Sequence, residues 1–368
     1  MKIILIQILF KRYIILNNIY MKINIIWKRN SGYIGTIFDY VQSFSRYSKH
    51  DIIYTDFPEM DLQADIIVLH YSIIHALVKR NVDIMNISQF KGKIVAIIQD
   101  EYYDVNKIKA MLKKCKVKLI LSCIPKEHHQ KIYNTTPNAR IERVLTGYVP
   151  ERTEFKKPQP IKNRETLIFY RGKNLPFTHG KLGQWKQHIG KKMKKNCEKM
   201  KIENINIAWN EQEKIFGSKW IITMHNAKVT LATPSGLNVF HYDDIKIIAC
   251  RNKQRNVEGY TYKMAEKEFN LQDGPIKMGQ ISPKMFEAAL CGTVLIMYPG
   301  TYNDIFKKDI HYIELQPDFS NIEEVMKKIQ DDDFLQEMSN RTYKDIVESG
   351  KYSYKTFICQ FDKWVDML

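Results

Sequence analysis

A single carboxylate stands inside an otherwise apolar stretch in the second half of the chain. Glu287 lies in the segment SPKMFEAALCGTVLIMYPG. Ser282 suits the N-cap of a helix, Pro283 suits its first turn, and Gly292 suits a left-handed residue just past its end. The apolar run that follows has the length of a strand. An unpaired buried carboxylate is costly, so Glu287 must either accept a structural salt bridge or N–H bond, or serve a ligand.

Two further stretches have the residue types that bind phosphate groups. In LIFYRGKNLP, Arg171 and Lys173 follow a predicted strand, and a guanidinium beside an ammonium suits a diphosphate. In KRNSGYIGTIF, Gly32 and Gly35 surround a predicted helix start, where backbone N–H groups can approach a phosphate. The structural alternatives are solvated surface cations in the first stretch and a plain tight turn in the second.

Polar residues at strand ends are the candidates for acid–base chemistry. Asp100 and Glu101 end one predicted strand in IIQDEYYD, and His70 ends another in VLHYS. Ser235 and Gly236, in ATPSGLNVF, end a third strand and could offer backbone contacts to a ligand. A helix cap or a loop contact is the structural alternative for each of these residues.

The sequence favours no metal site. Residues 331–333 contain Asp-x-Asp, which binds a metal in some transferases, but they lie between two predicted late helices. There the helix dipole favours acids at a helix start, which is our interpretation. The six cysteines form no C-x-x-C pair, so we expect a reducing compartment and no structural metal.

The composition indicates a globular protein with a large positive charge. The 368 residues, 44% hydrophobic and 26% charged, suffice for two domains with their own cores. The net charge of +17 is by itself weak evidence for a partner, but it is compatible with nucleic acid, an anionic membrane face or phosphorylated small molecules. The densest basic run, KKMKKNCEKMK, has no interleaved aromatic residues, so we interpret it mainly as a solvated helix face.

The first 20 residues are expected to be an N-terminal extension or a weak surface anchor. The apolar stretch IILIQILF is interrupted by Lys11 and Arg12, which leaves no span of about 18 apolar residues. No small-residue cleavage site follows, so a signal peptide is not expected either. We therefore place the start of the first domain at Met21.

From residue 21 onward, short apolar strands alternate with helices. Continuous apolar strands separated by helices predict parallel sheets covered on both faces. The expected strands span residues 23–27, 51–54, 65–70, 93–99, 117–122, 141–146, 166–170, 205–209, 228–233 and 293–298. Besides the helix that holds Glu287, the expected helices span residues 34–47, 105–114, 126–133, 181–199, 211–224, 321–330, 334–348 and 354–368.

The predicted fold class is α/β, with two Rossmann-like, doubly wound parallel-sheet domains facing a cleft. We expect the first domain at residues 21–150, a Pro-rich linker at 151–165, the second domain at 166–352 and a C-terminal helix at 353–368. In such sheets ligands bind outside the carboxyl ends of the strands. The cleft between the domains is therefore where we expect the chemistry.

Several segments together resemble one family. SPKMFEAALCGTVLIMYPGTYNDIF, followed by HYIELQPDFSN, resembles the C-terminal signature of bacterial group 1 glycosyltransferases, specifically the spore-maturation-type branch. GYVPE, YRGKNLP, EKIFGSKWI and TPSG have the order and spacing seen there. The resemblance covers roughly residues 65–364.

The resemblance implies a GT-B fold and an enzyme of the hexosyltransferase type, cytoplasmic and acting in polysaccharide biosynthesis. The first domain would bind the acceptor and the second a nucleotide-sugar donor, without a cofactor or a metal. Glu287 would bind the donor ribose, while Arg171 and Lys173 would neutralise the diphosphate. The other expected donor contacts are Ser235, Gly236, Ser282, Gly32 and Gly35. The expected catalytic residues are Asp100, His70 and Gln280.

The chain departs from the family pattern at one point. The usual motif has two glutamates eight positions apart, and Gly279 stands at the first of these positions. Gln280 is the candidate substitute, and retention of configuration is the family expectation. About 45 residues with strand-like and polar parts separate Ser235 from Ser282, and loops that long are often functional.

Three other functions remain alternatives. They are a nucleotide-sugar epimerase on the same fold, a catalytically silent nucleotide-sugar-binding protein, and a nucleic-acid-modifying transferase suggested only by charge. The expected partners of the leading function are the nucleotide-sugar donor and a glycan or lipid-linked acceptor. Peripheral contact with the anionic inner face of a membrane stays open, and nucleic acid is the least favoured partner.

Overall fold

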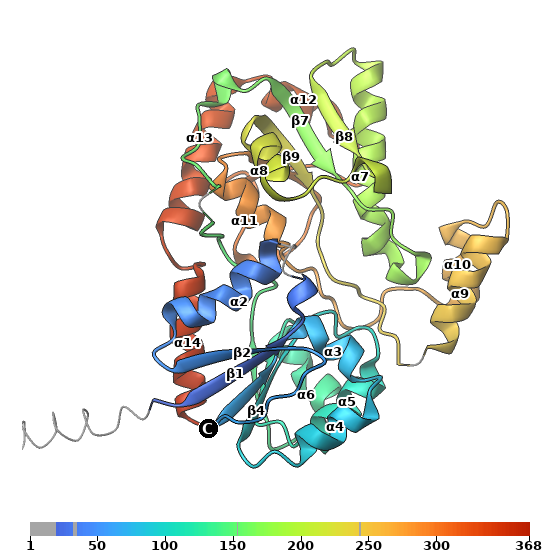
Figure 1. Cartoon of the computed structure of the whole chain (residues 1–368). Helices are drawn as coiled ribbons and strands as arrows, with labels where there is room; N and C mark the ends of the chain where they lie inside the picture. The colour runs from blue at the N-terminus through green and yellow to red at the C-terminus, as the bar shows by residue number, and fades with distance from the viewer. Residues whose placement is uncertain (1–19, 32–34, 153, 243) are drawn as a thin grey trace, which may run out of the picture.

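The chain forms two α/β domains stacked on each other (Figure 1). The computed structural model describes residues 20–31, 35–152, 154–242 and 244–368. Most of the expected N-terminal extension lies outside the described residues. None of the described helices combines the length and the apolar character needed to cross a membrane.

The first domain is built on a parallel six-stranded sheet with the order β2-β1-β3-β4-β5-β6. Its strands are β1 (Lys22–Trp27), β2 (Asp51–Asp56), β3 (Ile66–Leu69), β4 (Lys93–Ile98), β5 (Leu119–Ser122) and β6 (Arg140–Arg143). Its helices are α2 (Gly35–Tyr47), α3 (Tyr71–Leu77), α4 (Asn81–Ser88), α5 (Val105–Lys114) and α6 (His129–Tyr133).

The second domain is built on a parallel five-stranded sheet with the order β11-β10-β9-β7-β8. Its strands are β7 (Thr166–Arg171), β8 (Ile205–Ala208), β9 (Ala227–Ala232), β10 (Val294–Met297) and β11 (Tyr312–Glu314). Its helices are α7 (Gly180–Lys199), α8 (Gly217–His225), α9 (Ile245–Asn256), α10 (Tyr262–Phe269), α11 (Pro283–Leu290), α12 (Ile322–Ile329) and α13 (Asp332–Thr342). A π-helix, η7 (Tyr343–Glu348), continues α13.

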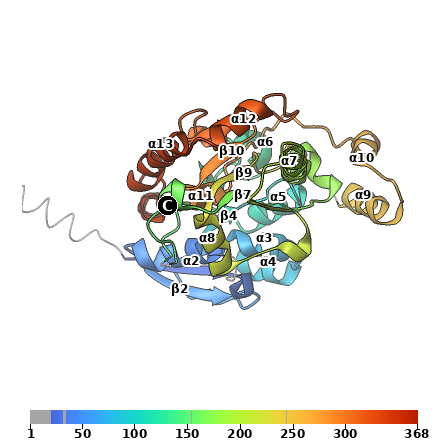
Figure 2. The ribbon, with the colours of Figure 1, turned by 90° about the horizontal axis from the view of Figure 1, so that it is seen from above.

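Three inner strands of the two sheets are buried over their whole length. β3 reads IIVL, β5 reads LILS and β10 reads VLIM, and every residue of these strands is buried. Strands buried on both faces need apolar side chains at successive positions, which is why these runs do not alternate with polar residues. Helices lie on both sides of each sheet (Figure 2).

The last helix, α14 (Tyr354–Asp366), packs on α2 of the first domain. The rings of Phe44 and Phe361 meet edge to face with centroids 5.0 Å apart. Asp362 accepts a hydrogen bond from the Ser48 hydroxyl at 2.7 Å. Ser353 caps the helix by accepting from the backbone N–H of Thr356. The chain thus ends on the domain with which it began.

Helix α11 begins and ends where the sequence predicts. Ser282 is its N-cap residue, Pro283 lies in its first turn, and Gly292 follows it with a φ of +65°. A left-handed residue at that place suits glycine, because a Cβ would be strained there. Its buried side chains are Met285, Phe286, Ala288 and Ala289.

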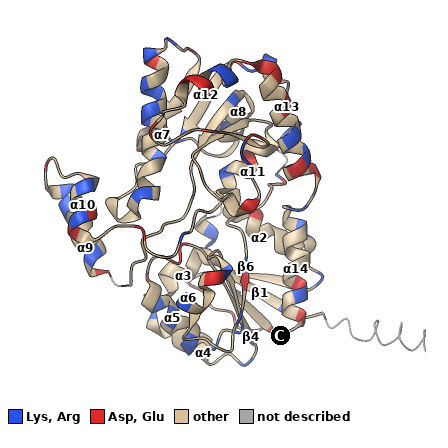
Figure 3. Ribbon diagram, turned by 180° about the vertical axis from the view of Figure 1, so that it is seen from behind, with Lys and Arg blue, Asp and Glu red and all other residues tan. Residues whose placement is uncertain are grey.

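Helix α7 carries the densest basic run on its solvent side (Figure 3). Lys191, Lys194 and Lys195 are exposed, whereas Met193 and Cys197 are buried in the core of the second domain. Long lysine side chains suit a solvated helix face, since their ammonium groups stay in water. The interpretation of this run as a solvated helix face is confirmed.

The segment between β9 and α11 differs from our expectation. We predicted strand-like and polar parts, but it contains the two helices α9 and α10. The apolar cluster Ile245–Ile248 is rich in β-branched residues, which favour strands over helices. Packing of Cys250 and Ala265 in a small hydrophobic cluster outweighs that preference. The hydroxyl of Thr261, which caps α10, was the sequence signal that we missed.

Candidate functional site

The carboxyl ends of the first sheet meet the loop that leads into α11. Thr146, just past β6, donates its hydroxyl hydrogen to the carbonyl of Ile281 at 2.9 Å. The side-chain amide of Gln280 donates to the carbonyl of Cys123, just past β5. We call this region, where both sheets end beside the start of α11, the junction. Parallel α/β sheets place their ligands at such strand ends.

Lys284 lies in the first turn of α11. Its Nζ donates to the carbonyl of Leu231 at 2.9 Å and lies 4.4 Å from the centre of the Tyr170 ring. Burial, together with the charge of Lys186, lowers the pKa of Lys284 to about 7, although Glu287 acts in the opposite direction. The ammonium group thus lies beside the end of β9, and its residue belongs to the first turn of α11, where the helix dipole is positive.

Two more lysines extend this positive region. Burial lowers the pKa of Lys186, which lies on α7. The charge of Asp100 opposes this shift, and the charge of Lys173 adds to it. Gly172 brings β7 close to α7, because a Cβ at that position would lie 2.8 Å from the carbonyl oxygen of Lys186. Among the described residues, none forms an ion pair with Lys173, Lys186 or Lys284. The three lysines therefore form a positive cluster without an ion-pair partner among the described residues, although the charges of Asp100 and Glu287 act on it, and such a cluster suits a polyanion.

Glu287, one turn further along α11, has partners. Its Oε1 accepts from Nη2 of Arg152 at 3.2 Å, and its Oε2 accepts from the indole N–H of Trp220 at 2.9 Å. Burial raises the pKa of Glu287, and the Trp220 hydrogen bond and the Arg152 charge oppose that rise. These contacts match the structural salt bridge and N–H bond that the sequence left open for this acid.

Arg152 connects Glu287 to the first domain. Its Nε donates to Asp39 of α2 at 2.9 Å, so one guanidinium joins acids from both domains. Burial raises the pKa of Asp39 to about 7, against the lowering effect of Arg152. The guanidinium also occupies the space in which a Cβ at Gly35 would stand. At Gly35 the free space is thus filled by an arginine side chain, where we expected a phosphate. Gly32 lies outside the described residues.

Arg171 does not face the lysine cluster as we expected. Its guanidinium donates to the carbonyls of Glu213 at 2.9 Å, of Tyr170 at 3.0 Å and of Asn206 at 3.1 Å. These bonds tie β7 to its neighbouring chain segments. The prediction that Arg171 neutralises a diphosphate is therefore wrong for this structure, because a position at a strand end does not determine which way a long side chain turns.

His70 is also placed differently from our expectation. It is fully buried, and its Nδ1 accepts from the backbone N–H of Ser72 at the start of α3. Its ring lies 4.0 Å from the centre of the Tyr71 ring, and burial lowers its pKa to about 3. A neutral, buried cap has no access to a substrate, so the structure contradicts the catalytic role predicted for His70.

Asp100 stays at the junction, beyond the end of β4. It has a φ of 58°, which is uncommon for a residue other than glycine and occurs often at functional sites. Its carboxylate accepts a hydrogen bond from the Tyr102 hydroxyl, and its charge acts on Lys186 of the other domain. Of the three residues predicted to be catalytic, Asp100 is therefore the one whose charge acts on a lysine of the cluster.

Ser235, Gly236 and Gln280 hold two chain segments together at the junction. Ser235 and Gln280 exchange backbone hydrogen bonds of 2.8 and 2.9 Å. Gly236 has a φ of +83°, and a Cβ there would lie 2.8 Å from the side chain of Met278. Gln280 is buried, and its amide is engaged with Cys123. Each of the three has a structural role in addition to any contact with a ligand.

The acids of residues 331–333 begin a helix, as predicted. Asp331 caps α13 by accepting from the backbone N–H of Phe334, and Asp332 pairs with Lys228 at 2.6 Å. The described residues contain no group of three or more histidines, cysteines or acids placed to hold a metal ion. The described cysteines are all free.

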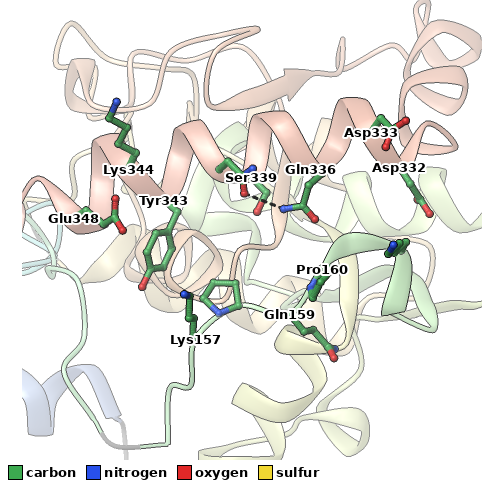
Figure 4. A pocket seen from close by; sticks show the side chains of 13 residues that line it. Lys157, Gln159, Pro160, Asp332, Asp333, Gln336, Ser339, Tyr343, Lys344 and Glu348 are labelled. Atoms are coloured by element: carbon green, nitrogen blue, oxygen red, sulfur yellow. Dashed lines mark hydrogen bonds between the residues drawn. The ribbon is translucent and has the colours of Figure 1, made fainter.

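A groove of about 720 Å³ lies between the linker and α13 (Figure 4). Lys157 and Lys344 line it together with Asp332, Asp333 and Glu348, so both signs of charge are present. Neither the linker nor α13 contributes to the lysine cluster. We therefore do not assign this groove to the candidate site.

Four residues of the site were not predicted from the sequence, namely Lys186, Lys284, Arg152 and Trp220. Lys284 could have been found, because it directly follows the predicted first helical residue, where cations and N–H groups together bind anions. Arg152 pairs with a carboxylate 135 positions away, and no local pattern marks such a contact.

Known structures share this architecture over almost the whole chain. An alpha-glucosyltransferase in complex with UDP and a 13-mer DNA containing an HMU base matches with a TM-score of 0.54 and 10% identity, over 95% of this chain and 100% of that chain. Anabaena Alr3699/HepE in complex with UDP and glucose gives the same values. T4 phage beta-glucosyltransferase matches with a TM-score of 0.50 and 13% identity, over 93% and 99% of the two chains.

The chain has a GT-B fold. The predicted fold class, two Rossmann-like parallel-sheet domains, is confirmed. At these identities the likeness concerns the fold alone. No family model matches the chain, and no curated protein does. The assignment to the spore-maturation-type branch stays a prediction.

Proposed function

We propose that this protein is a glycosyltransferase that moves a sugar from a nucleotide-diphosphate sugar to an acceptor hydroxyl. The observation that carries the proposal is the cluster of Lys173, Lys186 and Lys284, which has no ion-pair partner among the described residues. Lys173 is exposed, but Lys186 and Lys284 are half-buried, and such charges without an ion-pair partner are unfavourable unless a ligand supplies the opposite charge. A diphosphate at the start of α11 supplies that charge.

The lysines would act on the leaving group. In the transfer, the bond between the anomeric carbon and the phosphate oxygen breaks, a bond from that carbon to the acceptor oxygen forms, and the proton of the acceptor hydroxyl passes to the released diphosphate. The electron pair of the broken bond stays on the diphosphate, where negative charge increases. Fixed cations stabilise that charge more in the transition state than in the bound substrate. Because three ammonium groups are available, we propose that no metal ion is required.

Glu287 can still bind the donor ribose in this arrangement. A carboxylate has about four acceptor positions, and the bonds from Arg152 and Trp220 use one on each oxygen. The side chain keeps 12% of its surface exposed. We propose that the ribose hydroxyls bind the remaining positions, and that Arg152 holds the carboxylate in place for them.

The other donor contacts follow from position. The hydroxyl of Ser282 makes no capping hydrogen bond, so it is available to the diphosphate. We keep Ser235 and Gly236 as backbone contacts and Lys173 as a second cation, whereas Gly35 is no longer a donor contact because Arg152 fills the space beside it. Asp100 is the acid that we place at the transferred sugar, with Gln280 as a polar neighbour.

The finer assignments rest on the family resemblance. We propose a retaining enzyme of the group 1, spore-maturation-type branch that acts on a glycan or lipid-linked acceptor at the cytoplasmic side of a membrane. UDP is the first nucleotide to test, because the structural neighbours named above were solved with UDP or are glucosyltransferases.

The test uses the pure protein with a panel of UDP-, GDP- and TDP-sugars and no acceptor. We expect slow release of nucleoside diphosphate from one donor class. We also expect Lys186→Ala to weaken calorimetric binding of that nucleotide by roughly 30-fold, since charged hydrogen bonds contribute about 2 kcal/mol. Lys194→Ala, on the exposed side of the same helix, should bind like the wild type. An isomerised sugar would indicate an epimerase, and tight binding without turnover a silent binding protein.

A further inference from the structure

The segment between β9 and α11 crosses from the second domain onto the first. We call residues 235–280 the strap. Leu237, Ile276 and Met278 of the strap belong to the hydrophobic core of the first domain. The backbone N–H of His241 donates to the carbonyl of Tyr102 at 2.7 Å. The strap is therefore anchored on the domain in which it does not begin.

The strap carries the α9–α10 hairpin beside the first domain (Figure 1). The hairpin has its own small core, in which Cys250, Ala265, Leu271 and Val239 are buried against Phe177. Phe177 belongs to a 3₁₀ turn that precedes α7. The hairpin is thus fixed to the second domain through this core and to the first domain through the strap.

A cavity of about 390 Å³ lies between α9 and the first domain. The first domain contributes residues from the end of α3 and from the turn after β4, and α9 with its N-cap contributes the opposite wall. The lining residues are His75, Lys79, Asp100, Tyr103, Asp104, Asp244, Ile247, Ile248 and Arg251. The volume suits one or two sugar rings better than an extended polymer.

The charges in the cavity are of both signs and largely paired with each other. Asp104 accepts from His75 at 3.0 Å and lies near Lys107, which also pairs with Asp244. Burial raises the pKa of Asp104, but the hydrogen bond and charge of His75 and the charges of the nearby lysines have the larger combined effect. The pKa of Asp104 is therefore lowered, and the carboxylate stays ionised. Three carboxylates in one cavity disfavour a phosphate backbone and offer acceptors for hydroxyl groups.

The remaining wall is apolar. Ile247 and Ile248 lie beside Arg251, whose guanidinium is 6.0 Å from the centre of the Tyr103 ring. Sugars present hydroxyl groups at their edges and C–H groups on their faces. A cavity with carboxylates, one guanidinium and aliphatic side chains is complementary to such a ring.

We propose that this cavity binds the acceptor, as the terminal residue of an uncharged glycan, and that the strap contributes half of the acceptor site. The inference rests on the proposed function. Asp100 connects the two sites, because it lines the cavity and its charge also acts on Lys186 of the donor cluster. An acceptor hydroxyl held beside Asp100 is directed toward the donor.

A binding experiment tests the cavity without turnover. Saturation-transfer NMR on the full chain uses a panel of p-nitrophenyl glycosides of neutral sugars as probes. We expect binding of at least one glycoside, weakened about tenfold or more by Asp244→Ala and by Ile248→Glu. Ile248 is 57% exposed, so a glutamate there adds a charge to the wall without disturbing a core. Asn252→Ala, on an exposed position of the same helix, is the matched control.

A kinetic experiment then separates acceptor from donor. With a glycoside that binds, Asp244→Ala and Ile248→Glu should raise the acceptor KM about tenfold and leave the donor KM and the acceptor-independent release of UDP unchanged. Unchanged glycoside binding in both variants would overturn the proposal, and so would a rise in donor KM. Transfer to duplex DNA without any glycoside binding would also overturn it. If glycosides bind and the variants lose them, but no nucleotide sugar binds, the sugar site stands and the proposed function fails.

Discussion

Lys284 and Glu287, which lie one turn apart on α11, differ in whether a side chain of the protein donates to or pairs with their charge. Glu287 accepts from both Arg152 and Trp220, whereas Lys284 has a carbonyl and an aromatic face as neighbours. A buried charge with partners fixes the segments that supply them. A charge without a counter-charge reduces stability and is expected where a ligand brings the opposite charge.

The comparison separates two functions of one short helix. Its Glu287 side holds the linker and α8 in place through the two hydrogen bonds, and its Lys284 side faces the positive cluster. Replacing Glu287 should therefore affect stability, and replacing Lys284 should affect ligand binding. Each prediction below tests whether the two sides can be separated in this way.

We expect the largest change in nucleotide affinity from Lys284→Ala. We expect about 100-fold weaker binding of UDP or of the preferred nucleoside diphosphate, because one charged contact with the diphosphate is lost beside the helix start. The thermal midpoint should stay the same or rise, since an unpaired buried cation has been removed. Calorimetry and thermal unfolding measure the two quantities. A lower midpoint with unchanged affinity would show that Lys284 is structural.

The next effect is that of Glu287→Ala. Removing this acid leaves Arg152 with Asp39 alone and the Trp220 N–H unpaired, so we expect a loss of about 2–3 kcal/mol in the free energy of unfolding. If Glu287 also binds ribose, affinity per folded molecule falls about tenfold for UDP. Trp220→Phe is the control, because it removes one hydrogen bond and keeps the carboxylate. Unchanged affinity in folded Glu287→Ala would restrict the acid to the structural role.

The affinity for a nucleoside diphosphate should also depend on pH. The pKa of Lys284 is about 7, and a bound diphosphate favours the charged form and raises it. Binding above pH 7 therefore takes up a proton, so affinity falls as the pH rises, by up to about tenfold per pH unit. Measurements from pH 8 to 9 lie at least two units above the second phosphate pKa of about 6, so the ionisation of the phosphate stays nearly constant. Lys284→Arg should flatten the dependence, and an equal slope in that variant would contradict the assignment.

The smallest expected effect on donor binding is that of Arg171→Ala. Its guanidinium donates to three carbonyls, so we expect donor affinity to change less than about threefold, while stability falls by about 1–2 kcal/mol. Calorimetry with the preferred donor and chemical denaturation check both values. A large loss of affinity at unchanged stability would return Arg171 to the diphosphate site.

Long apolar patterns made the fold predictable. β3, β4 and β10 are continuous apolar runs, and α11 has recognisable residues at both ends. Helices α9 and α10 were not predicted, because their isoleucine cluster resembles a strand and their packing depends on Phe177 far upstream. β11 was not predicted because three residues give too little pattern.

The candidate site was less predictable than the fold. The sequence drew attention to Glu287 as a lone carboxylate in an apolar helix and to the end of β7 as a pair of cations after a strand, and their roles toward a donor stay predictions. It did not show that Arg171 turns into the sheet or that His70 is enclosed beside Tyr71. Such features depend on which neighbours a tertiary structure brings close, and a single sequence does not record that.

The path of the strap limits how this protein can move. The chain passes between the domains in the linker, twice in the strap, and once more before α14. A body joined by a single hinge can swing open widely, but several separated connections allow only small rotations about the line that joins them. Substrates must therefore enter and leave between domains that stay close together. A proteolytic cut in the linker should leave the two domains associated.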